Sequence, residues 1–322
     1  MASYALRRFL LIIPTLLIVT AVLFVLMRML PSGVVDQIAR NQEWTERSIG
    51  APQANTDAIR HMLGLDVPFY VQYVRWIGGF FHGDFGKSLY SSQTLIGNLK
   101  TKLPVTVELS VIALVFSLVS SIPLGIYSAI RQDTILDYIG RTWSIAALSV
   151  PGFFIAALVM IYPSIWWGWS PPVEYIPITK NLGGNLLQFV IPGAIMGLSG
   201  SGGTMRLTRT MTLEVLRQDY IRTAWSKGLR ERVVVLRHGM KNTLIPVITI
   251  VGGMIPGLLG GSVIMEQIFA LPGMGRYMLD AINMRDYNII SGWNIFMAAF
   301  VMVFIVLTDL AYAYVDPRIR YR

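Results

Sequence analysis

The 322-residue sequence predicts an all-α integral membrane protein with six transmembrane helices. Six apolar runs, each of about 20 residues or more, are long enough to cross the roughly 30 Å hydrocarbon core of a bilayer as helices. Hydrophobic residues make up 54% of the chain and charged residues only 14%, a balance that a soluble domain of this size does not need. The runs lie at about 9–30, 103–130, 139–167, 186–207, 244–266 and 292–315.

The first apolar run is expected to stay in the chain as a membrane anchor. Arg7 and Arg8 precede it, as in a secretory signal peptide, but "FLLIIPTLLIVTAVLFVLMRML" is longer than a signal core. The residues that follow are "PSGV", which contain no small-residue cleavage site. The chain has no cysteine, so disulfides and thiolate metal sites are excluded and the redox compartment is left open.

The distribution of Lys and Arg predicts the orientation of the spans, because short loops rich in these residues stay in the cytoplasm. The two arginines before the first span place the N-terminus inside. Six spans then place 131–138, 208–243 and the C-terminal "DPRIRYR" in the cytoplasm. The 208–243 loop carries eight basic residues, whereas the outward loop 168–185 carries a single lysine. The net charge of +9 is therefore mostly an asymmetry of the inner face, and it requires no nucleic acid as a partner.

The segment between the first two spans is predicted to form a compact extracytoplasmic subdomain, because it is too long for a passive connector. "TDAIRHMLG" is expected to form a short helix with Thr56 as its N-cap and Gly64 past its end. A second helix, "PFYVQYVRWIGGFF", is expected to begin at Pro68. Its regularly spaced aromatic residues are typical of a helix in the headgroup zone that covers the spans; docking of an external partner is the alternative. The predicted divisions are 1–30, 31–102 and 103–322.

No nucleotide-binding, metal-binding or ion-coupling site stands out in the sequence. "GLSGSGGTMR", residues 197–206, lacks the lysine of a phosphate-binding loop and is expected to permit close helix packing. The middle of every predicted span is free of ionisable residues, which disfavours a gradient-driven secondary carrier. The ionisable residues Arg28, Glu108, Glu266 and Asp309 lie near span ends.

Enzymatic functions are equally unsupported by the sequence. The three histidines lie on both sides of the predicted membrane and are not spaced as metal ligands. No pair of acidic or basic side chains suggests catalysis. We therefore predict no catalytic residue, no metal site and no cofactor bound by this chain. A membrane-embedded enzyme or a structural scaffold remains an alternative class without an identified site.

One stretch between the fourth and fifth apolar runs is unusually polar. "DYIRTAWSKGLRERVVVLRHGMKN", residues 219–242, holds six basic and two acidic residues. Asp219 is expected to cap a short helix, and Gly228 is expected to end it in the left-handed conformation. A second helix is expected from Arg230 into the fifth span, so that the loop of about 208–243 forms a helical projection.

The short helix of this projection is expected to place Tyr220, Ala224 and Trp225 on one face. Isolated helices below roughly 12–15 residues rarely persist in water, so another surface must pack against it. The alternative interpretation is a solvated basic loop that contacts only anionic headgroups.

Many stretches resemble, in the same order, the inner-membrane permease subunits of ATP-binding-cassette importers of the oligopeptide, dipeptide and nickel branch. They are "RRFLLIIPTLL", "LGLDVPFYVQYVRW", "GDFGKSL", "LPVTVELS", "DYIRTAWSKGL", "LRHGMKNTLIPV", "GGSVIMEQIFALPGMGRYMLDAI", "RDY" and "DPRIRY". The resemblance covers nearly the whole chain. It implies the type I importer permease fold, with a helical extracytoplasmic insertion between the first two spans.

The resemblance also implies that the polar stretch receives an ATPase subunit. The family motif reads Glu-Ala-Ala, three residues, Gly, and nine residues before Ile-x-Leu-Pro. Arg222, Thr223 and Ala224 occupy its first three positions, and Gly228 occupies that of the glycine. The second half departs, because "HGMK" stands in place of Ile-x-Leu-Pro. The implied ATPase-coupling residues are Asp219, Tyr220, Arg222, Thr223, Ala224, Lys227, Gly228 and Leu229.

The implied function is that of a subunit forming half of the translocation pathway of an importer for di- or oligopeptides. The alternatives are the same machinery carrying oligosaccharides or chelated nickel, and a secondary carrier. The implied partners are a second permease, two cytoplasmic ATPase subunits that bind ATP and Mg²⁺, an extracytoplasmic substrate-binding protein and membrane lipid. The implied location is the cytoplasmic or inner membrane of a bacterium or archaeon, with both termini in the cytoplasm. The residues along the substrate path do not follow from the sequence.

Overall fold

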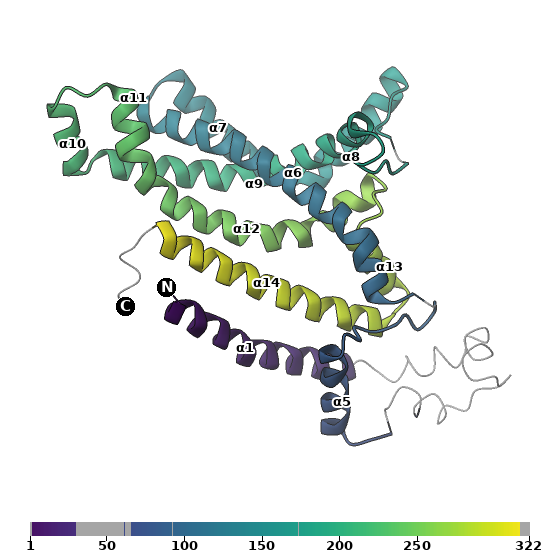
Figure 1. Ribbon diagram of the computed structural model, residues 1–322. Coiled ribbons are helices and arrows are strands. Elements are labelled where there is room, and N and C mark those ends of the chain that lie inside the picture. The colour runs from purple at the N-terminus through teal and green to yellow at the C-terminus, as the bar shows by residue number, and fades with distance from the viewer. Residues whose placement is uncertain (1, 30–60, 62–65, 92, 173, 316–322) are drawn as a thin grey trace. The chain divides into compact units, whose positions relative to one another are not determined.

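The computed structural model describes residues 2–29, 61, 66–91, 93–172 and 174–315. In this part of the chain the regular secondary structure is helical, with one isolated bridge between Lys87 and Thr94 (Figure 1). The helices are α1 (Ala2–Met29), α5 (Phe69–Phe81), α6 (Leu95–Ile130), α7 (Ile135–Ser149), α8 (Gly152–Trp167), α9 (Leu182–Leu216), α10 (Asp219–Ser226), α11 (Glu231–Val233), the π-helix Val234–Gly239, α12 (Met240–Ile268), α13 (Met274–Asn283) and α14 (Tyr287–Val315).

Among the described residues, four helical segments are long and apolar enough to cross a membrane. They are Leu95–Ile130, Leu182–Leu216, Glu231–Ile268 and Tyr287–Leu310. The pair α7 and α8 makes a fifth if it counts as one bent span, and α1 contains a shorter apolar stretch, Leu10–Leu26. The prediction of an all-α membrane protein is confirmed.

The third apolar run is not the single span helix that the sequence predicts. α7 and α8 are bent by 88° at the break between them. Pro151 explains the break, because proline lacks a backbone N–H and disfavours helical backbone in the residue before it. Val150 accordingly has extended backbone angles, φ −97° and ψ 118°. The apolar composition thus predicted the extent of the run but not its bend.

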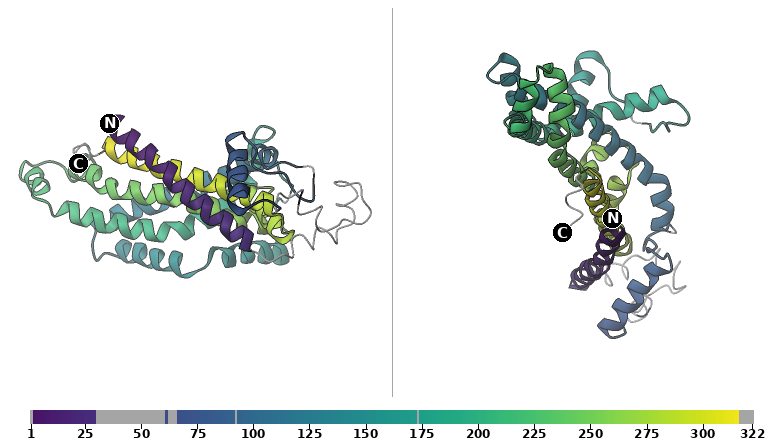
Figure 2. Two further views of the ribbon diagram at one scale, coloured as in Figure 1. Left: turned by 90° about the horizontal axis from the view of Figure 1, so that it is seen from below. Right: turned by 60° about the vertical axis from the view of Figure 1, so that its left-hand side comes forward.

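The chain forms two compact units. The first contains the described residues of 1–5, 103–276 and 303–322, and the second contains those of 6–102 and 277–302. In the first unit α9 is the central helix, because it contacts α7, α8 and α12 (Figures 1 and 2). The apolar core of this unit consists of Val105, Leu109, Ala113, Ala156, Phe189, Ile195, Met196, Leu258, Met265, Phe269 and Leu271.

Helices α6 and α9 approach each other closely at Gly197. A Cβ atom added at Gly197 would clash with the carbonyl oxygen of Ala113 and would lie 2.8 Å from the Cβ of Phe116. Only a residue without a side chain allows the two backbones to lie so near. The prediction that the glycine-rich run permits close helix packing is confirmed.

A buried ion cluster joins α6, α7 and α9. Asp137, near the start of α7, is fully buried. Its carboxylate accepts hydrogen bonds from Arg209 of α9 at 2.9 Å, from Arg141 one turn along α7, and from Ser128 of α6. A buried carboxylate requires such partners, because an unpaired charge in the interior costs several kcal/mol. The cluster therefore ties three helices together at one end of the first unit.

In the second unit, α5 covers α1 through its aromatic side chains. Phe24 of α1 is buried and packs against Phe69, Tyr73 and Trp76 at centroid distances of 4.9, 5.4 and 5.4 Å. The hydroxyls of Tyr73 and Thr20 lie 3.0 Å apart. The expected helix is confirmed as α5, although Pro68 is its N-cap and Phe69 its first residue. The other expected helix, "TDAIRHMLG", lies outside the described residues apart from its histidine, and "DPRIRYR" lies outside them entirely.

The stretch "GDFGKSL" of the second unit is joined to the start of α14 by Asp286. The Asp286 carboxylate accepts hydrogen bonds from Ser88 Oγ at 2.5 Å and from the backbone N–H of Leu89 at 3.3 Å. Burial raises the pKa of the Tyr90 hydroxyl, and the negative charge of Asp286 adds to this shift. The "RDY" motif therefore has a structural role that the sequence did not indicate.

Candidate functional site

The polar stretch folds as a helical projection at one end of the first unit (Figure 1). Ile221 is 0% exposed and Ala224 5%, so α10 turns these two side chains toward the rest of the chain. This contact explains why a helix of only two turns is stable. The hydrogen bonds within so short a helix are not sufficient by themselves, and the buried apolar area supplies the remaining stability. The apolar cluster contains Leu216, Ile221, Ala224, Leu229 and Val234.

The end of α10 agrees with the sequence. Gly228 has φ +69°, the left-handed conformation that glycine adopts without the penalty of a Cβ atom. The backbone N–H groups of Lys227 and Gly228 donate to the carbonyls of Thr223 and Trp225 and close the last turn. The predicted helix end at Gly228 is confirmed.

The start of α10 differs from the prediction. Gln218 occupies the N-cap position, without a side-chain capping hydrogen bond, and Asp219 is the first helical residue. In the first turn its carboxylate still interacts favourably with the helix dipole. Asp219 also pairs with Arg222 at 3.6 Å, but their side chains are 96% and 75% exposed, so the pair contributes little stability.

The structure separates the residues that were predicted to share one face of α10. Ala224 faces inward, whereas Tyr220 and Trp225 are 41% and 45% exposed. Successive helical residues are about 100° apart, so the contact made by Ile221 and Ala224 rotates their two neighbours outward. Tyr220 is held in place by Asn242 of α12, whose amide nitrogen donates to the Tyr220 hydroxyl at 2.7 Å.

The structure brings all eight predicted coupling residues into this projection, but it gives them two different positions. Six are exposed: Asp219, Tyr220, Arg222, Thr223, Lys227 and Gly228. The remaining two, Ala224 and Leu229, belong to the apolar cluster. The predicted coupling residues did not include Ile221 or Trp225, although Trp225 was expected on the same helix face as Ala224. Trp225 was recognisable from its size, because exposed tryptophans are frequent energetic anchors of protein interfaces.

A π-helix connects the projection to α12. Val234–Gly239 form this rare element, which is frequent at functional sites. Three consecutive valines, 233–235, and Gly239 are weak α-helix formers, which is the only local signal for it. The expected helix from Arg230 into the fifth span is present, with one turn locally unwound, and Glu231–Ile268 forms a continuous segment of 38 residues.

An ion pair links the projection to the turn after α6. Arg131 and Glu231 lie 3.1 Å apart with side chains 51% and 40% exposed. Because both side chains are exposed to this extent, this pair contributes little stability. The Tyr220–Asn242 hydrogen bond separately links α10 to α12. Within the described ranges, no three His, Asp or Glu side chains lie together as a metal site requires.

The chain is similar to known proteins along its whole length. Residues 121–321 match the family described as binding-protein-dependent transport system inner membrane component, and residues 1–110 match its N-terminal companion family. The chain is 36% identical over 324 residues to the oligopeptide transport system permease protein AppB of Bacillus subtilis, with 100% of both proteins covered. It is 33% identical to the dipeptide transport system permease protein DppB of the same organism, over 99% of this chain and 98% of that protein. It is also 34% identical to DppB of Alkalihalophilus pseudofirmus, with 100% of each covered.

Proposed function

This chain belongs to the family of binding-protein-dependent transport system inner membrane components, and from that premise we propose that it is the permease subunit of an ATP-binding-cassette importer for di- or oligopeptides. Its relatives bear the names of oligopeptide and dipeptide permeases, and the similarity extends over their full length. The chain forms half of the translocation pathway, a second permease forms the other half, and neither half catalyses a reaction.

In this proposal the exposed surface of α10 and the Gly228 turn dock on a cytoplasmic ATPase subunit. The observation that carries the proposal is the packing of α10. Its Ile221 and Ala224 side chains are buried in the chain's own apolar cluster, so the exposed Tyr220 and Trp225 remain available to a partner. A docking element must be held rigidly if it is to transmit a movement. The hydrogen bond to Asn242 and the π-helix link that movement to α12.

The proposal includes the orientation of the chain and its other partners. Both termini and the 208–243 loop lie in the cytoplasm, where two ATPase subunits bind ATP and Mg²⁺. The segment 31–102 lies outside, where it meets an extracytoplasmic substrate-binding protein. The asymmetry of Lys and Arg supports this orientation.

Substitution of Trp225 tests the docking surface. Trp225→Ala should lower co-purification of the ATPase subunit and peptide uptake by about tenfold or more, because truncation of an interface tryptophan typically costs about 2 kcal/mol or more. Trp169→Ala is the matched control, since both tryptophans are 45% exposed and Trp169 lies in the loop after α8. It should leave assembly and uptake unchanged.

Normal assembly and uptake in Trp225→Ala, and also in Lys227→Glu, would contradict the docking assignment. The polar stretch would then be a basic loop that contacts lipid headgroups. Ala224→Asp is not diagnostic, because a charge at this position disrupts the chain's own apolar cluster before any partner binds. The cargo class is tested in the same assembly with a labelled dipeptide, an oligosaccharide and chelated nickel, of which only the dipeptide should accumulate.

Cysteine labelling tests the orientation in this cysteine-free chain. Ser91→Cys should react with a membrane-impermeant reagent added outside intact cells, and Ser226→Cys should react only after the membrane is permeabilised. Both serines are exposed, so side-chain burial does not account for a difference. Reversed accessibility would show the opposite orientation.

A further inference from the structure

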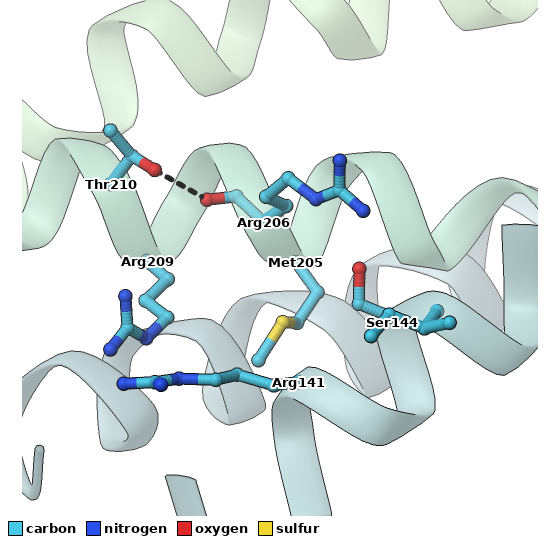
Figure 3. A pocket seen from close by; sticks show the side chains of 7 residues that line it. Arg141, Ser144, Met205, Arg206, Arg209 and Thr210 are labelled. Carbon is cyan, nitrogen blue, oxygen red and sulfur yellow. Dashed lines mark hydrogen bonds between the residues drawn. The ribbon is translucent and has the colours of Figure 1, made fainter. Parts of the chain in front are cut away.

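A cavity of about 390 Å³ lies between α7 and α9 in the first unit (Figure 3). Three arginines line it, Arg141 from α7 and Arg206 and Arg209 from α9, and no acidic residue does. We propose that this cavity binds the phosphate group of an acidic phospholipid, a ligand that the proposed transport function neither requires nor identifies.

The arginines keep hydrogen-bond donors free for such a ligand. Arg141 and Arg209 bind Asp137 through their Nε and Nη2 groups, and Arg141 also pairs with Asp133 at 3.3 Å. Neither Nη1 group donates a hydrogen bond within the described part of the chain. Figure 3 shows the two guanidinium groups next to each other beside α9. Asp137 holds both in position, so the phosphate meets donors that are already ordered.

Arg206 supplies a third cation that the fold does not otherwise use. Its side chain is exposed and makes no hydrogen bond or ion pair with another described residue. It precedes Arg209 by three positions on α9, but Figure 3 shows its guanidinium apart from those of Arg141 and Arg209, so it adds positive charge to the lining rather than a donor beside the other two. With Asp137 and Asp133 opposing three arginines, the cluster keeps a net positive charge for an anion.

The rest of the cavity favours a lipid over a free phosphate ion. Ile145 and Met205 form apolar walls, and Ile145 is 59% exposed. Leu148, three residues after Ile145 on the same helix, is 52% exposed, which extends the apolar surface beyond the cavity. A free phosphate has no use for such a surface, whereas the glycerol and acyl parts of a phospholipid cover it.

The position of the cavity along the chain also fits a headgroup. Arg206 lies at the end of the fourth apolar run, 186–207, and Arg209 follows two residues after it, where the predicted span meets the membrane surface. Basic pockets between spanning helices at the cytoplasmic surface are known to receive acidic headgroups. A lipid that binds there stabilises the contact between α7 and α9 by mass action.

Native mass spectrometry of the purified full-length chain tests the proposal, with phosphatidylglycerol and phosphatidylcholine titrated separately. Phosphatidylglycerol should bind at least about tenfold more tightly, because only its headgroup has a net negative charge. Arg206→Gln should weaken its binding about fivefold, the effect of one basic residue near an acidic membrane surface. Arg206→Lys should restore most of the affinity. Arg217→Gln removes the same charge from an exposed position at the end of α9 and should change nothing.

Each other outcome overturns the proposal. Equal affinity for the two lipids would show apolar association only, and equal weakening by Arg206→Gln and Arg217→Gln would show diffuse surface attraction. Displacement of phosphatidylglycerol by millimolar inorganic phosphate would identify a free-phosphate site, and displacement by an acidic dipeptide would place the arginines on the substrate path. Thermal unfolding of each variant, matched to the unmodified chain, establishes that both exposed substitutions leave the fold intact.

Discussion

Glu266 is the side chain whose replacement should destabilise the first unit most selectively. It lies near the end of α12 and is fully buried. Oε1 accepts hydrogen bonds from the hydroxyls of Thr106 at 2.7 Å and Ser262 at 2.9 Å, and Oε2 accepts one from the backbone N–H of Arg276 at 2.9 Å. One carboxylate thus connects α6, α12 and the start of α13.

The expected magnitude follows from what each substitution leaves without a partner. In Glu266→Ala the Arg276 N–H and the Thr106 hydroxyl lose their acceptor, whereas the Ser262 hydroxyl keeps its bond to the carbonyl of Leu259. A buried unsatisfied donor costs about 1–3 kcal/mol, so the loss should be about 2–6 kcal/mol. Glu266→Gln keeps one oxygen and presents an NH₂ group to the other donor, so it should cost about 1–3 kcal/mol.

Unfolding of the full-length chain in a mild detergent by added dodecyl sulfate, followed by tryptophan fluorescence, measures these losses. Glu214→Gln is the matched control, since it makes the same chemical change at an exposed position of α9 and should stay within about 0.5 kcal/mol of the unmodified chain. Thr106→Val should be less than additive with Glu266→Ala, because both remove the hydrogen bond between Thr106 and Glu266.

Unfolding of Glu266→Ala at the same dodecyl sulfate fraction as Glu214→Gln would refute this reasoning. The buried carboxylate would then have no net stabilising role, and its hydrogen bonds would only compensate for its own desolvation. Full additivity with Thr106→Val would show separately that the two side chains do not act through one contact.

Three further substitutions have matched controls in the same chain. Gly197→Ala should force α6 and α9 apart and cost about 1–3 kcal/mol in the same unfolding assay, whereas Gly203→Ala, with no atom within 4 Å of its Cβ, should be neutral. Asp137→Asn should cost about 3–5 kcal/mol because it leaves Arg209 without its charged partner, whereas Asp133→Asn, whose side chain is 74% exposed, should cost less than about 1 kcal/mol. Ile221→Ala should loosen α10 by about 2–4 kcal/mol, seen as faster amide hydrogen exchange in 219–226, while Thr223→Ala, exposed on the same helix, should leave that exchange rate nearly unchanged.

Local chemistry along the chain predicted where the helices of the membrane core lie. Apolar runs long enough to cross a bilayer coincide with α6, α9, α12 and α14. The reason is that backbone N–H and C=O groups in lipid must be hydrogen-bonded within the protein, and a single spanning segment satisfies its own groups only as a helix. Gly228 alone also predicted the end of α10, because a glycine in the left-handed conformation commonly ends a helix and Gly228 adopts that conformation. The eight predicted coupling residues therefore lie in one projection, as their closeness in sequence requires.

Only the tertiary structure decided which groups meet. Glu266 and Thr106 are 160 positions apart, and Asp137 and Arg209 are 72 apart, so no local pattern announces either contact. The same holds for α10, where the sequence offered several apolar side chains and the packing of Ile221 on Val234 selected the inward face. Periodicity shows that one side of a helix is buried, but the partner that buries it is chosen by long-range packing. A buried polar group is likewise satisfied by whichever donors the fold brings beside it.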